Sequence, residues 1–347
     1  MEQEIIMSEK SENFLINPQV NTSNSPEQAD IYELAKRLIE EVNNNNPQLT
    51  EIEEFTEIQF LGEGGFGKVY LARHQSTGEQ VAIKVIQPEF VGEDKFEKRF
   101  QREMQNITLL KHPNLVKMRY SDLWEGKLFY VMEYCNGGSL TDLLKKSGGM
   151  LPLERALQIT FQALDGLDYL HNVEIPNTTT RNAKGLVHRD IKPGNILLSQ
   201  IDGIETVKIA DYGLAKAFDL AGLSHITSNK KSGDKILAIG TLGFMPMQQI
   251  FDSKYVKPEV DIWAMAASLY QMLTRTTPRD FPQNSDIWEV VSTTQPTPIR
   301  DRNNSIPEQV AKVIDSALKD DESELHFKTA VEFKQALMTC YGNTISL

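Results

Sequence analysis

The chain has 347 residues, of which 40% are apolar and 24% charged, as is typical of an ordinary soluble globular protein. Single hydrophobic cores usually split beyond about 250–300 residues, so two lobes or domains are expected. The formal net charge of −12 argues against an obligate nucleic-acid binder. This charge is uneven: residues 1–54 hold twelve acidic and three basic residues, net −9, which leaves −3 for the remainder.

The two cysteines, Cys135 and Cys340, exclude a disulfide framework as the stabilising device and indicate a reducing compartment. The acidic N-terminus has no long apolar stretch, so no secretory signal is visible. The apolar run at 262–273 is interrupted by Ser268 and Gln271 and is far shorter than the roughly 20 residues that cross a bilayer. We therefore expect a cytoplasmic protein that does not enter the membrane.

Residues 1–54 form an acidic arm rich in Glu, Asn and Ser, which we expect to be partly disordered. Within it, residues 26–42 have the spacing of one amphipathic helix. Its apolar face would comprise Ile31, Leu34, Ala35, Leu38 and Ile39. Two interpretations stay open: a solvated arm with one marginal helix, or a helix that docks on a partner or on this chain itself.

From residue 55 onward the pattern changes to short β-branched and aromatic runs separated by glycine-bearing turns, which predicts an antiparallel sheet. The expected strands lie at 60–61, 69–72, 81–86, 115–120 and 128–134, with a helix at 96–110. Helices are expected at 140–146, 153–171, 260–274, 308–319 and 330–340. Strands followed by helices indicate an α+β fold with a β-rich N-lobe and a mainly helical C-lobe.

A glycine-rich loop begins the strand region, with Gly62, Gly64 and Gly67 in the pattern G-x-G-x-x-G-x-V. Glycines allow backbone amides to approach phosphate oxygens without a Cβ in the way. A Rossmann or Walker loop would lead into a helix, whereas this loop leads into another strand. The pattern therefore predicts a hairpin that covers a nucleotide.

An apolar strand ends with Lys84, and Glu103 follows nineteen residues later on the expected helix 96–110. An ammonium held by a carboxylate can bind the α- and β-phosphates of a nucleotide. Further along, residues 188–195 read HRDIKPGN and residues 211–213 read DYG. With these motifs in this order, residues 55–340 resemble the eukaryotic-like (Hanks-type) serine/threonine protein kinase family, and in particular its bacterial members.

The resemblance implies ATP and Mg²⁺ as the reaction's nucleotide and metal ion. Asn195 and Asp211 would hold Mg²⁺ through hard oxygen ligands. Asp190 would orient the substrate hydroxyl and accept its proton, and Lys192 would steady the γ-phosphate, as in serine/threonine kinases. Lys84, paired with Glu103, would complete the catalytic group.

The family also implies how the adenine would bind. Met132 falls at the gatekeeper position, and the backbone of Glu133 and Cys135 would form hydrogen bonds to the base. Val69, Ala82 and Leu197 would enclose its ring. Ser139 replaces a carboxylate that contacts ribose in many relatives. Asp261 would hold the backbone of the catalytic loop, and Thr241 would contact Asp190 and Lys192.

Two positions depart from the family pattern. The segment that usually closes with glutamate ends in Gln248, and the arginine that usually pairs with this glutamate is replaced by His326. Loss of one end of a buried pair costs about 3–5 kcal/mol, whereas replacing both ends can be nearly neutral. One hypothesis is a neutral Gln248–His326 hydrogen bond; the other is a looser helical base without a special contact.

Two segments are longer than the family usually has. Residues 172–184 form a polar insertion that we expect to be a surface loop, and the activation segment spans 211–248. Arg189 precedes Asp190, an arrangement that lets a phosphorylated segment dock on an arginine. We expect phosphorylation among the hydroxyls of this segment, the alternative being a flexible loop with incidental hydroxyls. These sites are Ser224, Thr227, Ser228 and Ser232.

The sequence thus predicts a serine/threonine protein kinase that transfers the ATP γ-phosphate to protein hydroxyls. The expected division is an arm at 1–54 and a kinase domain at 55–341, with an N-lobe at 55–131, a hinge at 132–138 and a C-lobe at 139–341. A pseudokinase that binds or scaffolds without turnover is the main alternative. A small-molecule kinase is disfavoured by Lys192 and by the Gly240-Thr241 pair.

Overall fold

The computed structural model describes most of residues 55–345 together with a short N-terminal segment. The described residues are 30, 33–37, 55–64, 67–86, 104, 106–124, 127–174, 185–213, 242–251, 256–282, 285–320 and 327–345. Glu103, Thr241, His326 and the expected phosphorylation sites lie outside them, as do residues 175–184 of the insertion. No helix within these ranges is long and apolar enough to cross a membrane.

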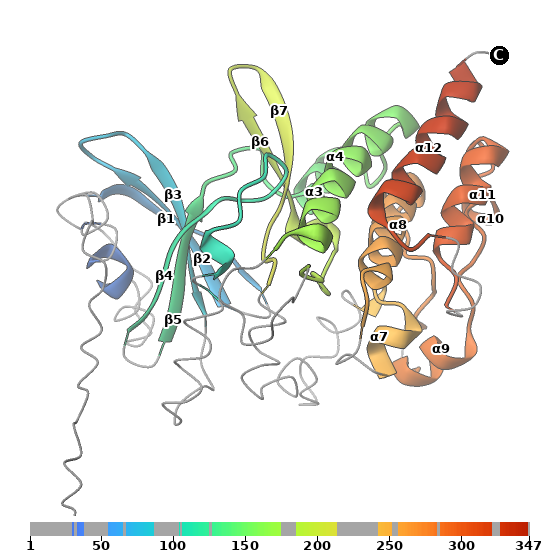
Figure 1. Cartoon of the computed structure of the whole chain (residues 1–347), viewed down its shortest axis with the longest axis horizontal. Coiled ribbons are helices and arrows are strands. Elements are labelled where there is room, and N and C mark those ends of the chain that lie inside the picture. Colours follow the sequence, from blue (N-terminus) through green and yellow to red (C-terminus); the bar gives the residue numbers. More distant parts are fainter. Residues whose placement is uncertain are drawn as a thin grey trace, which may run out of the picture.

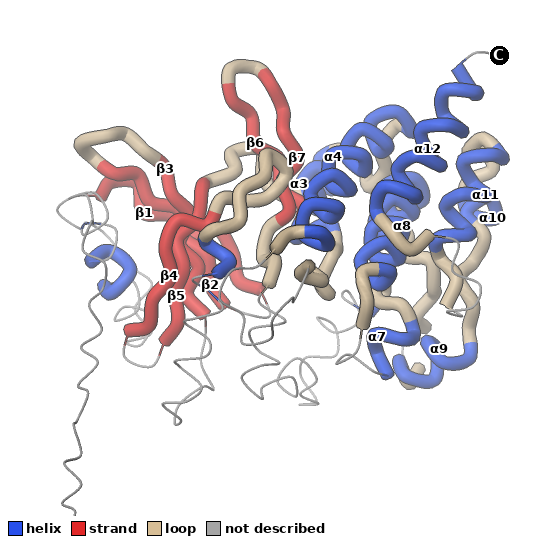
Figure 2. The backbone as a smooth tube through the Cα atoms, in the orientation of Figure 1, coloured by secondary structure: helices blue, strands red, loops and turns tan. Residues whose placement is uncertain are grey.

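The N-lobe is an antiparallel sheet of five strands in the order β1-β2-β3-β5-β4 (Figures 1 and 2). The strands are β1 (Phe55–Gly64), β2 (Gly67–His74), β3 (Gln80–Ile86), β4 (Met118–Trp124) and β5 (Lys127–Glu133). In the register, Val69 of β2 lies opposite Lys84 of β3, which lies opposite Tyr130 of β5. Because strand side chains alternate between faces, these three residues share one face of the sheet.

The opposite face of the sheet is apolar and buried. It carries a cluster formed by Tyr70, Ala72, Val81, Ile83, Val85, Phe129 and Val131. Leu34 and Ala35, from the helical segment at 33–37, are fully buried in the same cluster. Asp30 reaches the end of β2, where its carboxylate lies 3.2 Å from Nε2 of His74. In the described residues, part of the arm therefore packs against the outer face of the sheet (Figure 1).

The C-lobe is mainly helical, and its helices gather on the other side of the molecule (Figure 1). They are α3 (Leu140–Lys146), α4 (Leu153–Asn172), α7 (Met247–Phe251), α8 (Glu259–Thr274), α9 (Ile287–Thr293), α10 (Ile299–Arg302), α11 (Glu308–Ala317) and α12 (Ala330–Ile345). Thirteen of the sixteen residues of α8 are buried, so this helix forms the centre of the lobe. Lys334 of α12 binds Asp165 of α4 at 2.6 Å.

A two-stranded hairpin, β6 (Ile196–Ile201) and β7 (Ile204–Ile209), lies between the sheet and the helices (Figure 2). Asp202 and Gly203 turn the chain with positive φ values of 52° and 79°. Single bridges connect Leu115 to Ile209 and Ser139 to Leu197. The hairpin is thus attached to residues that precede and follow the expected hinge. The HRDIKPGN motif ends at Asn195, directly before β6, and the DYG motif begins at Asp211, two residues after β7.

The sequence predicted the fold class correctly: five strands precede a helical lobe. The helix at 140–146 has the expected bounds because Ser139 and Asp142 form a capping box at its start. The hairpin at 196–209 and the short helices α9 and α10 were not predicted. Helix α12 continues to Ile345, beyond the expected end of the domain at residue 341.

Candidate active site

The segment 188–195 is held from below by the first turn of α8. Asp261 is fully buried and accepts hydrogen bonds from the backbone amides of His188 at 2.7 Å and Arg189 at 2.8 Å. Its carboxylate also lies 2.8 Å from Nε2 of His171. Burial alone would raise the pKa of Asp261, but the hydrogen bond and charge of His171, with a contribution from His188, lower it. As expected, Asp261 fixes the backbone of this loop.

His188 connects the loop to the base of the β6–β7 hairpin. Its ring is buried, with Nε2 donating to the carbonyl oxygen of Ala210 at 2.8 Å and Nδ1 accepting from the amide of Asp190 at 3.2 Å. Arg189 and Asp211 both have positive φ, 68° and 61°. Such backbone conformations cost non-glycine residues about 1–3 kcal/mol and persist where the surroundings enforce them. The two strained residues lie in the HRDIKPGN and DYG motifs.

Asp190 is surrounded by donors from its own loop. Nζ of Lys192 lies 2.9 and 2.8 Å from the two carboxylate oxygens of Asp190. Nδ2 of Asn195 donates to the backbone oxygen of Asp190 at 2.7 Å and to its Oδ2 at 2.9 Å. The expected catalytic residues Asp190 and Lys192 are therefore in direct contact, and Asp190 orients the side-chain amide of Asn195.

Asp211 lies under the N-lobe sheet, in contact with two of its strands. Lys84 donates to Oδ2 at 2.5 Å, and the Tyr130 hydroxyl donates to Oδ1 at 2.5 Å. Burial would raise the pKa of Asp211, but the charge of Lys84 and the two hydrogen bonds lower it below its ordinary value. Burial and the nearby Asp211 charge raise the pKa of Tyr130. Asp211 is thus an ionised carboxylate with a protonated tyrosine beside it.

Gly62 and Gly67 of the glycine-rich loop differ in whether the fold itself requires glycine. At Gly67, with φ of 147°, a Cβ would lie 2.0 Å from the carbonyl oxygen of Val85, so the fold itself requires glycine. At Gly62 nothing lies within 4 Å of where a Cβ would be. The fold leaves that space open, which suits close approach of a ligand to the backbone.

Beyond Gly67, the cleft face of the sheet continues with residues expected to enclose adenine. Ala82 of β3 lies opposite Met132 of β5, and both are buried. Leu197 packs against the same core cluster from the hairpin, as does the half-buried Val69. Val69 and Leu197 therefore pack against the same apolar cluster that contains Ala82 and Met132.

A model of the protein kinase domain family matches residues 55–331. The chain belongs to this family. It is 33% identical over 221 residues to CBL-interacting protein kinase 21 of Oryza sativa subsp. japonica, a match that covers 63% of this chain and 38% of that protein. It is 29% identical over 277 residues to a probable serine/threonine-protein kinase of Clostridium perfringens (strain 13 / Type A), covering 79% of this chain and 36% of that protein.

The fold of this kinase domain also matches solved structures. The crystal structure of the Mycobacterium tuberculosis PknI kinase domain superposes with a TM-score of 0.60 at 23% identity, covering 84% of this chain and 98% of that one. The curated relatives are longer proteins, of which the chain spans about two fifths, at 38%, 43% and 36%.

The hinge of the kinase is braced through the side chain of Glu133. Its Oε1 accepts from the backbone amide of Lys117 at 2.6 Å and from Nζ of Lys208 at 2.9 Å. Burial, together with the Glu133 charge, raises the pKa of the Cys135 thiol to about 12. Cys135 is therefore a protonated packing residue at neutral pH.

The end of the activation segment is anchored by a different pair from the one the family pattern implies. Arg279 and Asp320 form a buried ion pair, with Arg279 over the ring of Trp263. Oδ1 of Asp320 accepts from the backbone amide of Met247 at 3.1 Å. The neutral bond expected between Gln248 and His326 cannot be placed, because His326 lies outside the described residues.

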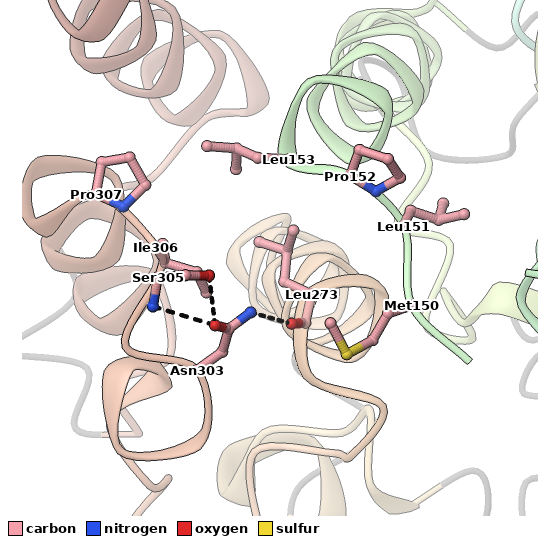
Figure 3. Close-up of a pocket in the computed structure, with 9 residues that line it drawn as sticks. All are labelled: Met150, Leu151, Pro152, Leu153, Leu273, Asn303, Ser305, Ile306 and Pro307. Carbon is pink, nitrogen blue, oxygen red and sulfur yellow. Dashed lines mark hydrogen bonds between the residues drawn. The ribbon is translucent and has the colours of Figure 1, made fainter. Parts of the chain in front are cut away.

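A cavity of about 350 Å³ opens in the C-lobe, away from these motifs (Figure 3). It is lined by Met150, Leu151, Pro152, Leu153, Leu273, Asn303, Ser305, Ile306 and Pro307. None of the lining side chains is ionisable, and Asn303 is engaged by the carbonyl of Leu273 and by Ser305. The cavity therefore contains none of the residues that the sequence motifs single out.

Sequence reasoning missed the role of Tyr130, and it noted Tyr212 without predicting the contact that its hydroxyl makes. Tyr130 was interpreted only as a strand residue, although it lies two positions before Met132 and so on the same face of β5. Tyr212 replaces the usual phenylalanine, and its buried hydroxyl donates to the carbonyl of Val116 at 2.7 Å. The expected Lys84–Glu103 pair lies partly outside the described residues; the described partner of Lys84 is Asp211.

Proposed function

We propose that this chain transfers the γ-phosphoryl group of ATP to serine or threonine hydroxyls of proteins. Two groups of contacts carry the proposal: Lys84 with Asp211, and Lys192 and Asn195 with Asp190. A backbone hydrogen bond from Ala210 to Asn195 connects the two groups. Phosphoryl transfer requires positioning and positive charge more than covalent chemistry. These five side chains supply both.

The side-chain oxygens of Asn195 and Asp211 fit a magnesium ion. Nδ2 of Asn195 is engaged by Asp190, which leaves the Oδ1 of Asn195 as its ligand atom. The carboxylate of Asp211 would supply the other protein ligand. No group of three or more His, Cys, Asp or Glu side chains gathers as a metal cage within the described ranges. A pair of oxygen ligands completed by substrate phosphates is the usual arrangement for Mg²⁺. When bound, Mg²⁺ supplies charge that neutralises the triphosphate.

The chain's own groups have separate tasks in this scheme. Asp190 orients the incoming hydroxyl and accepts its proton on a carboxylate oxygen. Lys192 is close enough to Asp190 to place its ammonium beside the same substrate group, where it steadies the transferred phosphoryl. Lys84 contributes a second ammonium under the glycine-rich loop, near the α- and β-phosphates.

The nucleotide would be held between the lobes. Backbone amides around Gly62, Gly64 and Gly67 face the phosphates, and the backbone of Glu133 and Cys135 pairs with the adenine edge. Val69, Ala82 and Leu197 enclose its ring, consistent with their common apolar surface. The intact set of acidic and basic side chains favours turnover over the pseudokinase alternative, which would not require an Asp190–Lys192 contact.

The N-terminal arm would serve as a clamp on this chain's own N-lobe. The burial of Leu34 and Ala35 in the outer-face cluster and the Asp30–His74 contact support docking in cis. Ser76 and Thr77 hydroxyls lie 3.1 Å from Nδ1 of His74, so this ring nitrogen accepts and Nε2 is left to donate to Asp30. Protein substrates remain the partners expected at the cleft.

The decisive test is the intact mass of phosphatase-treated protein after incubation with Mg-ATP, alone and with a generic protein substrate. We expect phosphate on the wild type or on the substrate, and none with Asp190→Asn. Fragment mapping would then locate sites in the activation segment. An absence of transfer despite a thermal shift induced by Mg-ATP would instead support the pseudokinase alternative.

A further inference from the structure

Tyr130 lies on the sheet face that carries Lys84, at a position where a hydrophobic side chain would suffice for packing. It is 1% exposed, lies in the middle of β5 and faces Lys84 across the β3–β5 ladder. Its ring also lies 5.8 Å from Nζ of Lys84, within range of a cation–π contact. A buried tyrosine hydroxyl needs a hydrogen-bond partner, so its presence here calls for a polar explanation.

That partner is the carboxylate expected to bind the metal ion. The Tyr130 hydroxyl donates to Oδ1 of Asp211 at 2.5 Å, while Lys84 occupies Oδ2 at the same distance. Both oxygens of Asp211 therefore already contact donors of the chain itself. Hydrogen bonds to a buried charged group are stronger than neutral ones, so a competing ligand must offset them.

The neighbouring Tyr212 supplies a contrast within the same few residues. It is as deeply buried and directly follows Asp211, but its hydroxyl donates to the carbonyl of Val116 at 2.7 Å. The two tyrosines thus differ in the acceptor rather than in burial. One hydroxyl braces the backbone, and the other acts on the charged oxygen.

We propose that Tyr130 is a positioning residue that donates to Asp211 and thereby sets the Mg²⁺ concentration at which nucleotide binds tightly. This inference rests on the proposed function, since it takes Asp211 as a metal ligand. Tyr130 stabilises the ligand-free carboxylate through a bond that coordination weakens. Its removal therefore leaves Asp211 a better ligand for the metal ion.

The test is binding of a fluorescent ADP analogue, mant-ADP, measured across a MgCl₂ titration. In Tyr130→Phe, we expect the half-maximal Mg²⁺ concentration to fall by about tenfold or more, the fold-change that corresponds to one hydrogen bond to a charged group. The mant-ADP Kd without Mg²⁺ should stay within about twofold of wild type. In the matched control Tyr212→Phe, which removes an equally buried hydroxyl, the Mg²⁺ midpoint should match wild type.

An unchanged or higher Mg²⁺ midpoint in Tyr130→Phe would overturn the inference while leaving the proposed function intact. An equal shift in Tyr212→Phe would overturn it too, because the effect would then follow from loss of any buried hydroxyl. If Tyr130→Phe fails to fold, Tyr130→Met gives the same measurement with another side chain that lacks a hydroxyl. A wild type without Mg²⁺-dependent nucleotide binding would overturn the proposed function and this inference together.

Discussion

The two faces of the N-lobe sheet are built from alternate residues of the same strands and differ in what their contacts do. On the outer face, Ile83 and Val131 join an apolar cluster that Leu34 completes. On the cleft face, Lys84 and Tyr130 direct their polar atoms to one carboxylate. Apolar burial is non-directional, whereas hydrogen bonds at 2.5 Å depend on position.

This difference shows how strand alternation separates stability from chemistry. A shift of one residue in the β3–β5 register would exchange the faces, placing Ile83 over Asp211 and Lys84 in the apolar cluster. The apolar outer face therefore fixes the register on which the cleft face depends. Substitutions on the two faces should have separable effects.

The largest effect is expected on the outer face, from Leu34→Ala. Because Leu34 is fully buried, truncation should lower the free energy of unfolding by about 2–5 kcal/mol. Urea unfolding would measure it. The matched control is Leu109→Ala, since Leu109 is 56% exposed and its truncation should change stability by about 0.5 kcal/mol or less. Equal stabilities of the two variants would contradict the docking of the arm.

On the cleft face, Lys84→Met should reduce turnover by about 10²–10³-fold, the usual cost of one preorganised electrostatic contact. Phosphate transfer would be assayed at a temperature at which all variants are folded. Leu34→Ala should then retain turnover within about twofold of wild type. Lys117→Met, which removes an exposed lysine that binds Glu133 through its backbone, serves as the control. Comparable losses in Lys84→Met and Leu34→Ala would remove the distinction between the faces.

The smallest expected effect is a change in the free energy of unfolding at acidic pH. It should appear for a charged residue and not for an apolar one. The pKa of Asp261 lies below its ordinary value of 3.8, so the ionised form adds stability above about pH 4 that is lost as pH falls toward the lowered value. The stability difference between wild type and Asp261→Asn should therefore narrow as the pH falls below 4, by about 0.5 kcal/mol at pH 3.5. Urea unfolding from pH 6 to pH 3.5 would show this narrowing.

The difference between wild type and Leu34→Ala should stay constant over the same pH range, because neither leucine nor alanine ionises. A constant difference for Asp261→Asn as well would mean that the hydrogen bonds from His188 and Arg189 do not depend on the charge of Asp261.

Local patterns predicted much of this fold. The run at 81–86 predicted a strand, and Ser139 with Asp142 encodes the start of α3. The hairpin at 196–209 was missed because its strands pair mainly with each other, joined to the rest of the chain by single bridges. For the arm, spacing placed Leu34 and Ala35 on one helical face, but a sequence does not say which surface that face covers.

The candidate site likewise contains residues that the sequence predicted and contacts that it did not. The motifs located Asp190, Asn195 and Asp211, because each carries a residue type that the chemistry demands. They did not indicate that Lys84 contacts Asp211 here, or that Tyr130 joins them, because those contacts arise from strand register and from the hairpin that presents Asp211. Likewise, Arg279 and Asp320 are far apart in sequence, and their pairing follows from helix packing.

That buried pair has an evolutionary consequence. Asp320 holds the start of α7 through the backbone amide of Met247, an atom that every residue except proline provides. Selection on this attachment would therefore act on the side chains at positions 279 and 320. Position 247 keeps its donor whichever residue other than proline it carries, so its side chain can vary while the anchor stays in place.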